Sequence, residues 1–382
     1  MKKILLFTLL FFIINNKINA EMILAPNSQS AILIEASTGK IIYEKEKDEK
    51  RSPASMTKIM TFLLTVEALE NGQIKLTDKV LISKNASGMG GTQIFIEEGT
   101  YVTVEDLIKG LGIASANDAA VALAEYIGGT EDNFISMMNK RAKELGCKNT
   151  NFKNPHGLDE EEHYSSAYDM SLMAKELVKH DYALQISSTY EEYINVSGEN
   201  HWLVNTNKLV KFYKGIDGLK TGYTDKAKYC LTATMNKNNM RLISVVMGAD
   251  TKDNRTADTI SMMEYGNNMY TSKTIYKKED ITGKINIKNS VNRKAKYTLE
   301  EDINIITEKT RKEIDYTSEI LLDDVKAPLK KGDKVGTLKL NVDNNTLEYN
   351  LVVTEDIEKA SFMQTYFNLL KDIITGSVKI KI

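Results

Sequence analysis

The sequence predicts a mixed α/β fold of the α+β kind, followed by a small all-β domain and a C-terminal amphipathic helix. Apolar runs rich in β-branched residues at 30–43 and 229–247 lie on either side of a block with helical periodicity, which favours one sheet built from early and late strands. After residue 275, short segments alternate between apolar and polar residues, as in β-strands. Over 362–374, apolar residues recur at steps of three and four, which is the helical pattern.

Length and composition set the outer limits. A chain of 382 residues is long for one core and predicts two domains. Hydrophobic and charged contents of 42% and 27% exclude wholesale disorder. A formal charge of −2 argues against nucleic-acid binding, which needs a basic face. We expect a leader at 1–20, a catalytic domain at 21–275, a β domain at 276–357 and a terminal helix at 358–382.

The N-terminus carries a targeting signal. Lys2 and Lys3 precede an apolar run from Ile4 to Ile14, which is shorter than the roughly twenty residues that span a bilayer. A polar stretch ending in Ala20 follows, a pattern typical of a secretory signal peptide that is cleaved after this alanine. An uncleaved N-terminal anchor is the alternative. Both interpretations place the rest of the protein outside the cytoplasm.

The predicted elements of the first domain follow in order. Two strands flank a turn at 37–40, and a helix with Ser52 as its N-cap and Pro53 at its first position ends near residues 71–72. Residues 87–99 contain four glycines and predict a mobile loop. Helical patterns cover 104–127, with an interruption at 110–112, and 171–178.

The later part of the chain returns to strands. Residues 229–234 and 241–247 predict a hairpin, and 335–342 and 347–353 predict another within the small β domain. The terminal helix has an apolar stripe, and two alternatives fit it equally: docking on its own domain, or lying in a membrane interface.

The first candidate for chemistry is the pair Ser55 and Lys58. Residues three apart on a helix share a face, so the amine can reach the hydroxyl, and the start of a helix favours the developing negative charge. A lysine can act as a base if burial or a nearby cation lowers its pKa. The spacing alone is weak evidence, because Ser37 and Lys40 have the same spacing in a predicted turn.

Two further motifs follow in the chain. Ser115 and Asn117 offer a hydroxyl that could relay a proton and a carboxamide that could hold a substrate amide. Lys220 and Thr221 suit recognition of a carboxylate, and Gly222 would let a substrate backbone approach an edge strand. The order SxxK, SxN, KTG is far more specific than any one of the three motifs.

With these motifs the chain resembles the D-alanyl-D-alanine carboxypeptidases of the low-molecular-weight penicillin-binding protein family. The resemblance extends over nearly the whole chain beyond the leader and rests on the segments PASMTK, SANDA, HGLD, YSSA and GLKTG at residues 53–58, 115–119, 156–159, 164–167 and 218–222. It implies a β-lactamase/transpeptidase-like catalytic domain, peptidoglycan stem peptides as substrates and β-lactams as covalent inhibitors. It also implies attachment to the membrane surface through the terminal helix.

The resemblance also implies roles for individual residues. Ser55 would be the nucleophile, Lys58 the general base and Ser115 the proton relay, while Asn117 would hold the substrate amide. Lys220 and Thr221 would bind the terminal carboxylate beside Gly222, and the backbone of Tyr223 would contribute to the oxyanion hole. Arg255 matches a family arginine near that carboxylate. Some members have glycine where this chain has Ala116, and histidine where it has Tyr223.

Other chemistries find less support. The four histidines show no metal-ligand spacing such as HExxH, so no metal or other cofactor is expected, and His156 is assigned a structural hydrogen bond. Cys147 and Cys230 are interpreted as free thiols, with a disulfide as the alternative. A DD-endopeptidase, a β-lactamase of the same fold and a catalytically silent wall-binding protein are the rival functions. No ExxLN-type stretch supplies the glutamate that a β-lactamase would need.

Overall fold

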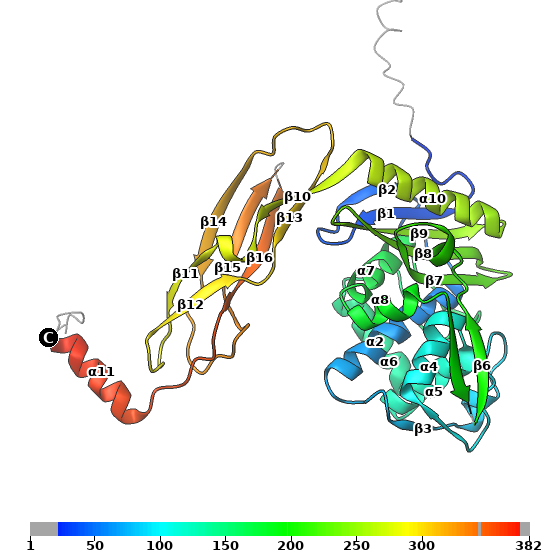
Figure 1. Ribbon diagram of the computed structural model, residues 1–382, viewed down its shortest axis with the longest axis horizontal. Helices are drawn as coiled ribbons and strands as arrows, with labels where there is room; N and C mark the ends of the chain where they lie inside the picture. The colour runs from blue at the N-terminus through cyan, green and yellow to red at the C-terminus, as the bar shows by residue number, and fades with distance from the viewer. Residues whose placement is uncertain (1–21, 197, 343–344, 375–382) are drawn as a thin grey trace, which may run out of the picture. The chain divides into compact units, whose positions relative to one another are not determined.

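A computed structural model describes residues 22–196, 198–342 and 345–374 (Figure 1). The predicted leader lies outside these residues, so its cleavage stays a prediction. The chain forms two compact units. The first contains the residues up to 265, apart from the segments 35–40 and 236–241, which group with the second unit.

One five-stranded sheet forms the centre of the first unit, with the strand order β2-β1-β9-β8-β7. Its strands are β1 (Ser30–Glu35), β2 (Ile41–Lys45), β7 (Ile216–Thr224), β8 (Lys228–Lys237) and β9 (Met240–Ala249). β1 lies next to β9, which confirms that early and late strands share a sheet. β7 is an edge strand, so within the described residues it pairs with a strand on one side only.

Helices cover the sheet in Figure 1, where α10 (Lys252–Met269) lies along one face and α2 (Lys58–Glu70) and α8 (Asp181–Ser188) lie on the other. The remaining helices of this block are α4 (Val104–Lys109), α5 (Asn117–Gly128), α6 (Glu131–Glu144) and α7 (Ala167–Leu177), together with the short α3 (Lys84–Ser87) and α9 (Leu209–Phe212). A π-turn, η2 (Gly110–Ala114), separates α4 from α5 where the sequence predicts an interruption. Two small hairpins, β3 (Lys79–Leu81) with β4 (Tyr101–Thr103) and β5 (Glu191–Val196) with β6 (Glu199–Val204), complete the unit.

The start of the helix near residue 53 differs from the prediction. A 3₁₀ turn, η1 (Ala54–Thr57), precedes α2, and Pro53 rather than Ser52 stands at its N-cap. The Ser52 hydroxyl donates instead to the Asp159 carboxylate, at 2.7 Å. A side chain engaged there is not available to cap the helix, so the Ser52 cap is wrong.

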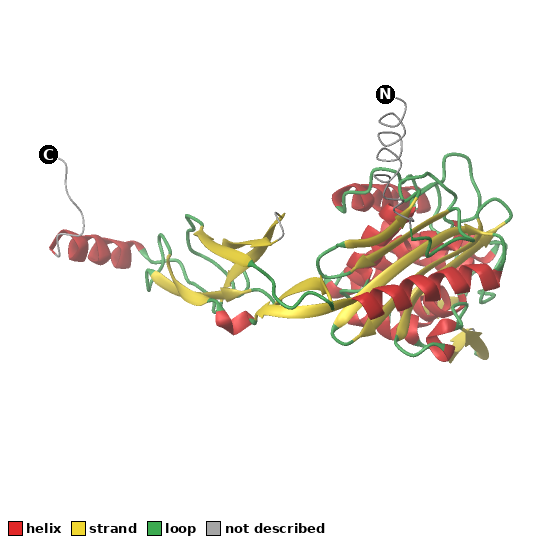
Figure 2. Ribbon diagram, turned by 90° about the horizontal axis from the view of Figure 1, so that it is seen from above, coloured by secondary structure: helices red, strands yellow, loops and turns green. Residues whose placement is uncertain are grey.

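The second unit is mainly β-structure, as Figure 2 shows. β11 (Thr282–Asn286), β12 (Lys294–Leu299), β16 (Asn345–Val353), β15 (Lys334–Val342) and β14 (Tyr316–Leu322) form one sheet in this order. β10 (Tyr270–Tyr276) pairs with β13 (Ile303–Glu308), and the short turn η3 (Lys278–Asp280) lies between β10 and β11. Leucines at 299, 338, 340 and 351 are fully buried in its core. The predicted all-β domain is therefore confirmed.

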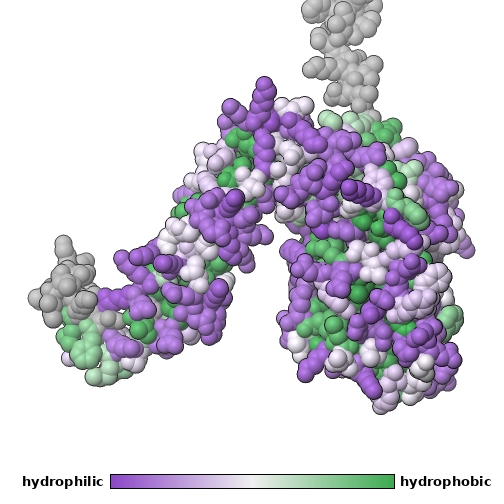
Figure 3. Space-filling view, in the orientation of Figure 1, coloured by the Kyte–Doolittle hydropathy of each residue, from purple (hydrophilic) through white to green (hydrophobic). Residues whose placement is uncertain are grey.

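The chain ends, within the described residues, in α11 (Phe362–Ile374). Figure 3 shows a green surface beside the grey terminus, and six large apolar side chains of α11 are exposed: Phe362, Met363, Tyr366, Phe367, Leu370 and Ile373. Within the described residues, no helix combines the length and apolar character needed to cross a bilayer. Cys147 and Cys230 are free thiols, which confirms the first of the two alternatives for them.

Candidate active site

Ser55 and Lys58 meet where η1 passes into α2. In a 3₁₀ turn, residues three apart lie almost directly above one another, which brings Lys58 Nζ to 3.1 Å from Ser55 Oγ. Ser55 remains partly exposed to solvent, whereas Lys58 is 1% exposed. The hydroxyl is thus accessible from outside, and the amine approaches it from inside the protein.

The surroundings of Lys58 favour a neutral amine. Burial and the charge of Lys220 hold the pKa of Lys58 well below its ordinary value of 10.5, and Asp118 opposes this shift. Nζ also lies 2.6 Å from both Asn117 Oδ1 and the backbone oxygen of His156. A neutral amine can donate to these two oxygens and turn its lone pair towards the Ser55 hydroxyl, the geometry of a general base.

Residues from a distant segment support this turn. The backbone N–H of Lys153 donates to His163 Nδ1, so the ring proton lies on Nε2, which donates to Thr57 Oγ1 at 2.8 Å. Gly157 has a φ of +88°, and a Cβ atom there would lie 1.9 Å from the Ala54 carbonyl oxygen. The segment that carries both histidines therefore packs directly against the nucleophile turn.

The two histidines of this segment are neutral. Burial, followed by the charge of Lys58, lowers the pKa of His156 to about 3, and burial lowers the pKa of His163 to about 4. His156 Nδ1 accepts from the backbone N–H of Leu158, which agrees with the structural role predicted for it.

Ser115 and Asn117 lie on either side of the junction between η2 and α5. Ser115 is buried with a φ of 68°, a left-handed conformation that turns the chain sharply into the helix. Among the described residues its hydroxyl has no hydrogen-bond partner. Asn117 contacts Lys58 through its Oδ1, so the first and second motifs meet at this amide.

Hydrogen bonds join the glycine-rich loop at 87–99 to Asn117. Asn117 donates from Nδ2 to the Gly90 carbonyl and from its backbone N–H to the Thr92 carbonyl, each at 2.7 Å. A Cβ at Gly91 would lie 2.7 Å from Asn117 Nδ2. These contacts tie this part of the loop to the site, and mobility of the loop 87–99 stays a prediction.

The third motif lies in the edge strand β7. Thr221 Oγ1 donates to Thr206 Oγ1 at 2.8 Å, and Lys220 Nζ donates to the Thr221 carbonyl. Gly222 has a use that the sequence did not reveal: a Cβ there would lie 2.8 Å from the Pro53 carbonyl oxygen. The missing side chain lets β7 approach the nucleophile turn itself, which brings the three motifs together in one site, named here the active-site cleft.

Positive charge gathers at the Lys220 end of the cleft. Lys220 is 4% exposed, and burial together with the charge of Arg255 lowers its pKa to about 7. Arg255 lies in the first turn of α10, where burial lowers its own pKa and its Nε has no hydrogen-bond partner among the described residues. Such buried cations suit an anionic group entering from solvent.

Two aromatic side chains pack together near the C-terminal end of β7. Tyr223 is exposed and packs on Tyr229, with 4.4 Å between ring centroids, and its hydroxyl donates to Asp225. This hydrogen bond is the main reason why the pKa of Tyr223 is raised. The side chain of Tyr223 thus contacts Tyr229 and Asp225 at the surface, while its backbone continues β7.

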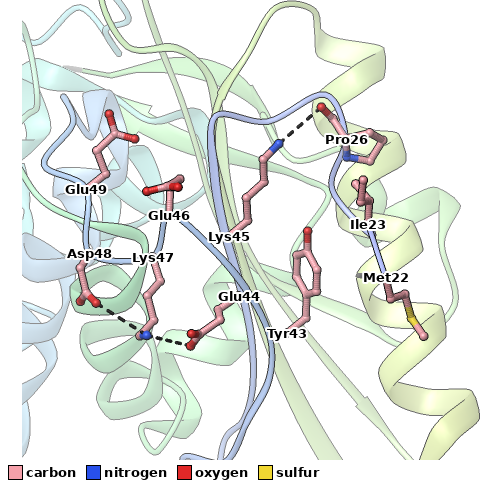
Figure 4. A pocket seen from close by; sticks show the side chains of 10 residues that line it. All are labelled: Met22, Ile23, Pro26, Tyr43, Glu44, Lys45, Glu46, Lys47, Asp48 and Glu49. Carbon is pink, nitrogen blue, oxygen red and sulfur yellow. Dashed lines mark hydrogen bonds and ion pairs between the residues drawn. The ribbon is translucent and has the colours of Figure 1, made fainter. Parts of the chain in front are cut away.

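A separate hollow lies elsewhere in the same unit. It has a volume of about 790 Å³ and lies between residues 22–26 and the segment 43–49 (Figure 4). Lys45 contacts the backbone oxygens of Ala25 and Pro26 there, and Lys47 pairs with Glu44 and Asp48. None of the candidate site residues lines this hollow, so we do not assign the reaction to it.

Comparison with known proteins agrees with the three motifs. Residues 17–251, more than half of the chain, match the D-alanyl-D-alanine carboxypeptidase family, peptidase S11. The chain belongs to this family. Residues 270–359 match the C-terminal domain of penicillin-binding protein 5, which accounts for most of the second unit of this carboxypeptidase-family chain.

Individual relatives cover almost the same length. The D-alanyl-D-alanine carboxypeptidase DacF of Bacillus subtilis is 49% identical over 343 residues, covering 89% of this chain and 88% of the relative. Penicillin binding protein 5 from Haemophilus influenzae is 32% identical, with a TM-score of 0.70, covering 87% of this chain and 98% of that structure. Penicillin-binding protein D2 from Listeria monocytogenes, in its ampicillin-bound form, is 30% identical with a TM-score of 0.57 over 62% of this chain and 96% of that one.

Sequence reasoning missed the residues that support the motifs. Thr206, His163 and Gly157 contact Thr221, Thr57 and the Ala54 carbonyl, respectively. The HGLD segment gave a signal through its resemblance to the family, but nothing in it indicated that the glycine packs against the nucleophile turn. Thr206 had no signal in the sequence.

Proposed function

We propose that this chain removes the terminal D-alanine from peptidoglycan stem peptides through an acyl-enzyme on Ser55. The observation that carries the proposal is the contact of 3.1 Å between Ser55 Oγ and the buried amine of Lys58. A serine hydroxyl is a weak nucleophile until a base removes its proton, and a lysine with a lowered pKa is such a base.

The first half of the reaction forms the acyl-enzyme. Ser55 Oγ attacks the carbonyl carbon between the last two D-alanines, and Lys58 Nζ takes the hydroxyl proton. The tetrahedral intermediate collapses as the C–N bond breaks, and the departing amine receives a proton through Ser115. This leaves an ester on Ser55 and a free D-alanine.

The second half restores the enzyme. Water attacks the ester carbonyl, gives up a proton to the base, and the C–O bond to Ser55 breaks as Oγ regains a proton. The products are the shortened peptide carboxylate and free Ser55. Neither half needs a metal or an organic cofactor, because every proton moves between side chains, water and substrate.

The remaining residues bind the substrate in this scheme. Lys220, Thr221 and Arg255 attract the terminal carboxylate, and Asn117 holds the peptide amide. The backbone N–H groups of Ser55 and Tyr223 stabilise the oxyanion, a contribution of about 3–4 kcal/mol in comparable sites. β7 is an edge strand, so the substrate can align beside it as an additional strand.

Two of the rival functions would use the same chemistry at Ser55, and the third would not use it. A DD-endopeptidase or a β-lactamase would use the same Ser55 acyl-enzyme, with a different amine leaving group or faster hydrolysis of a β-lactam adduct. A silent wall-binding protein would have no use for a buried lysine in contact with a serine. The relatives are named D-alanyl-D-alanine carboxypeptidases, which favours the release of D-alanine over the rival functions.

A penicillin adduct tests the proposal. We expect penicillin to add one covalent label, mapped to the peptide that carries Ser55, and a stem-peptide mimic to release D-alanine. Ser55→Ala should lose both. Ser37→Ala is the matched control: Ser37 and Lys40 share the spacing of the motif, but the Ser37 hydroxyl hydrogen-bonds to Glu35. If the wild-type protein forms no adduct and releases no D-alanine, the proposal is wrong.

We also propose that the protein works at the outer face of the cytoplasmic membrane. The N-terminal sequence supports export, and the exposed apolar residues of α11 support binding to a lipid surface. Exposure favours this over docking on the β domain, because a docked helix would cover its apolar stripe.

A further inference from the structure

A buried carboxylate lies next to the site and has no part in the reaction described above. Asp118 is 0% exposed in the first turn of α5. Its oxygens accept the backbone N–H groups of Ile94 at 3.1 and 3.2 Å, Ile96 at 3.3 Å and Ala119 at 2.9 Å. All these partners are donors, which is the arrangement for an ionised carboxylate. Burial raises the pKa of Asp118, and these bonds oppose the shift.

Asp118 and its neighbour Asn117 hold one segment between them. Asn117 binds the carbonyls of Gly90 and Thr92, and Asp118 binds the N–H groups of Ile94 and Ile96. Every second residue of the segment 90–96 is therefore fixed to the start of α5. Because Asn117 Oδ1 also contacts Lys58 Nζ at 2.6 Å, the position of this segment determines where the Asn117 amide lies.

Asp118 also acts on the base through its charge. The charged groups that act on Lys58 are Lys220 from β7, which lowers its pKa, and Asp118 from α5, which raises it. His156, on the third side, is neutral because its own pKa is about 3. Arg255 acts one step away, on Lys220. Among the described residues, Asp118 is thus the negatively charged group that raises the pKa of Lys58.

We propose that Asp118 is a positioning residue for the acylation of Ser55, which fixes the segment 90–96 against Asn117 and supplies the negative charge that balances Lys58. The inference rests on the proposed function, because it assumes that Lys58 is the base. Asp118 itself touches neither substrate nor the reacting atoms.

Asp118→Asn tests both parts, since it removes the charge and replaces one acceptor oxygen with a donor. We expect acylation by a fluorescent penicillin to slow by about tenfold to a hundredfold, as for a misplaced catalytic group. Loss of the negative charge lowers the pKa of Lys58, so the acid limb of the pH–rate profile should move to lower pH. A residue with only a structural role would leave this limb in place.

Asp169→Asn is the matched control. Asp169 is likewise buried in the first turn of a helix, α7, and accepts from the backbone N–H of Asn149 and the Thr150 hydroxyl. We expect this variant to lose stability while the acid limb stays where it is. If the folded Asp118→Asn protein keeps the wild-type rate and acid limb, or differs from wild type only as Asp169→Asn does, the inference is overturned.

Two further measurements keep the inference testable: amide exchange serves if the enzyme is inactive, and a second variant, Gly91→Ala, serves if Asp118→Asn folds poorly. Amide exchange at Ile94 and Ile96 should be about ten- to a hundredfold faster in Asp118→Asn, because each loses a bond to a charged group. Gly91→Ala keeps the carboxylate but places a methyl against Asn117 Nδ2, so it should slow acylation without moving the acid limb. A Gly91→Ala protein with the wild-type rate would refute the positioning. Failure of wild-type acylation would refute the proposed function instead, and the exchange rates would still decide whether Asp118 holds the segment.

Discussion

The active-site cleft and the terminal helix α11 depart from the usual distribution of side chains in opposite directions. The cleft buries Lys58 and Lys220, at 1% and 4% exposure, whereas α11 exposes Phe362 at 83% and Phe367 at 60%. Folded proteins ordinarily keep lysines in water and bury large aromatic side chains. Each departure costs free energy, which some other interaction has to offset.

The two regions offset that cost differently. Inside the cleft, Lys58 finds its partners within the fold, at distances of 2.6 to 3.1 Å. For the exposed side chains of α11, the cover would come from a lipid surface under the proposal made above. The cleft should therefore respond sharply to small changes in volume or charge, whereas α11 should respond only to the loss of apolar surface. Three experiments test this contrast.

The largest effect is expected from a single methyl group in the cleft. Gly157→Ala places a Cβ 1.9 Å from the Ala54 carbonyl oxygen, at a φ of +88° where a side chain is already strained. We expect a loss of more than about 3 kcal/mol in the free energy of unfolding, because backbone must move to relieve the contact. Urea denaturation followed by circular dichroism measures it.

Gly146→Ala separates strain from contact. Gly146 has nearly the same φ, +86°, but a Cβ there meets no atom within 4 Å. This variant should lose only about 1–2 kcal/mol, the cost of the left-handed conformation itself. Equal losses in the two proteins would show that the close packing of the cleft contributes nothing, and the contrast with α11 would lose its basis.

A smaller effect is expected from the charge of Lys220. With a pKa of about 7, its amine is charged below that pH and becomes neutral as the pH rises through it. Attraction for a carboxylate should fall accordingly, and one pH unit above the pKa only about a tenth of the amines remain charged. If the rate follows the charged fraction, which falls from about one half at pH 7 to about one hundredth at pH 9, acylation by penicillin should slow by about fiftyfold over this range.

Lys220→Arg tests the origin of this alkaline limb, since a guanidinium stays charged throughout this pH range. The rate near pH 7 should drop, because the longer side chain must fit a buried site, but the fall above pH 7 should disappear. Lys226→Arg, at an exposed position after β7, should leave the limb unchanged. An alkaline limb that persists in Lys220→Arg belongs to another group.

The sequence was sufficient for the features that depend on local patterns. Periodicity predicted the interruption between α4 and α5 and the helix α11, and it placed strands on either side of the helical block. The three motifs predicted the residues that meet in the cleft, because their spacing fits a turn that brings Ser55 and Lys58 together. Each of these inferences needed only residues close together in the chain.

The supporting contacts could not be predicted in this way. Thr57 and His163 are 106 positions apart, and either residue alone is an ordinary polar side chain. Ser52 has the right chemistry for a helix cap, but Asp159, which accepts its hydroxyl, lies 107 positions along the chain. Gly222 looked like an opening for substrate because the sequence does not show that β7 packs on the Pro53 carbonyl. These features depend on contacts between residues far apart in the chain, and local sequence patterns contain no information about such contacts.

Substitutions in α11 should have the smallest effect on the stability of the fold, but they should clearly weaken binding to lipid vesicles. Replacing Phe362 and Phe367 with serine removes two of its most exposed aromatic side chains. Burying one such side chain contributes about 1.5–3 kcal/mol, so even partial insertion of the pair into lipid predicts at least about a tenfold loss of binding to vesicles that contain anionic lipid. Deleting residues 360–382 should abolish binding, and both variants should keep the thermal stability and soluble-substrate activity of the wild type.

Phe212→Ser is the control for these variants, because Phe212 is 69% exposed but lies on α9 and not on α11. If Phe212→Ser weakens vesicle binding as much as the α11 pair does, general stickiness explains the binding. If the truncated protein still sediments with vesicles, α11 is not the anchor, and its exposed stripe must meet another protein surface instead.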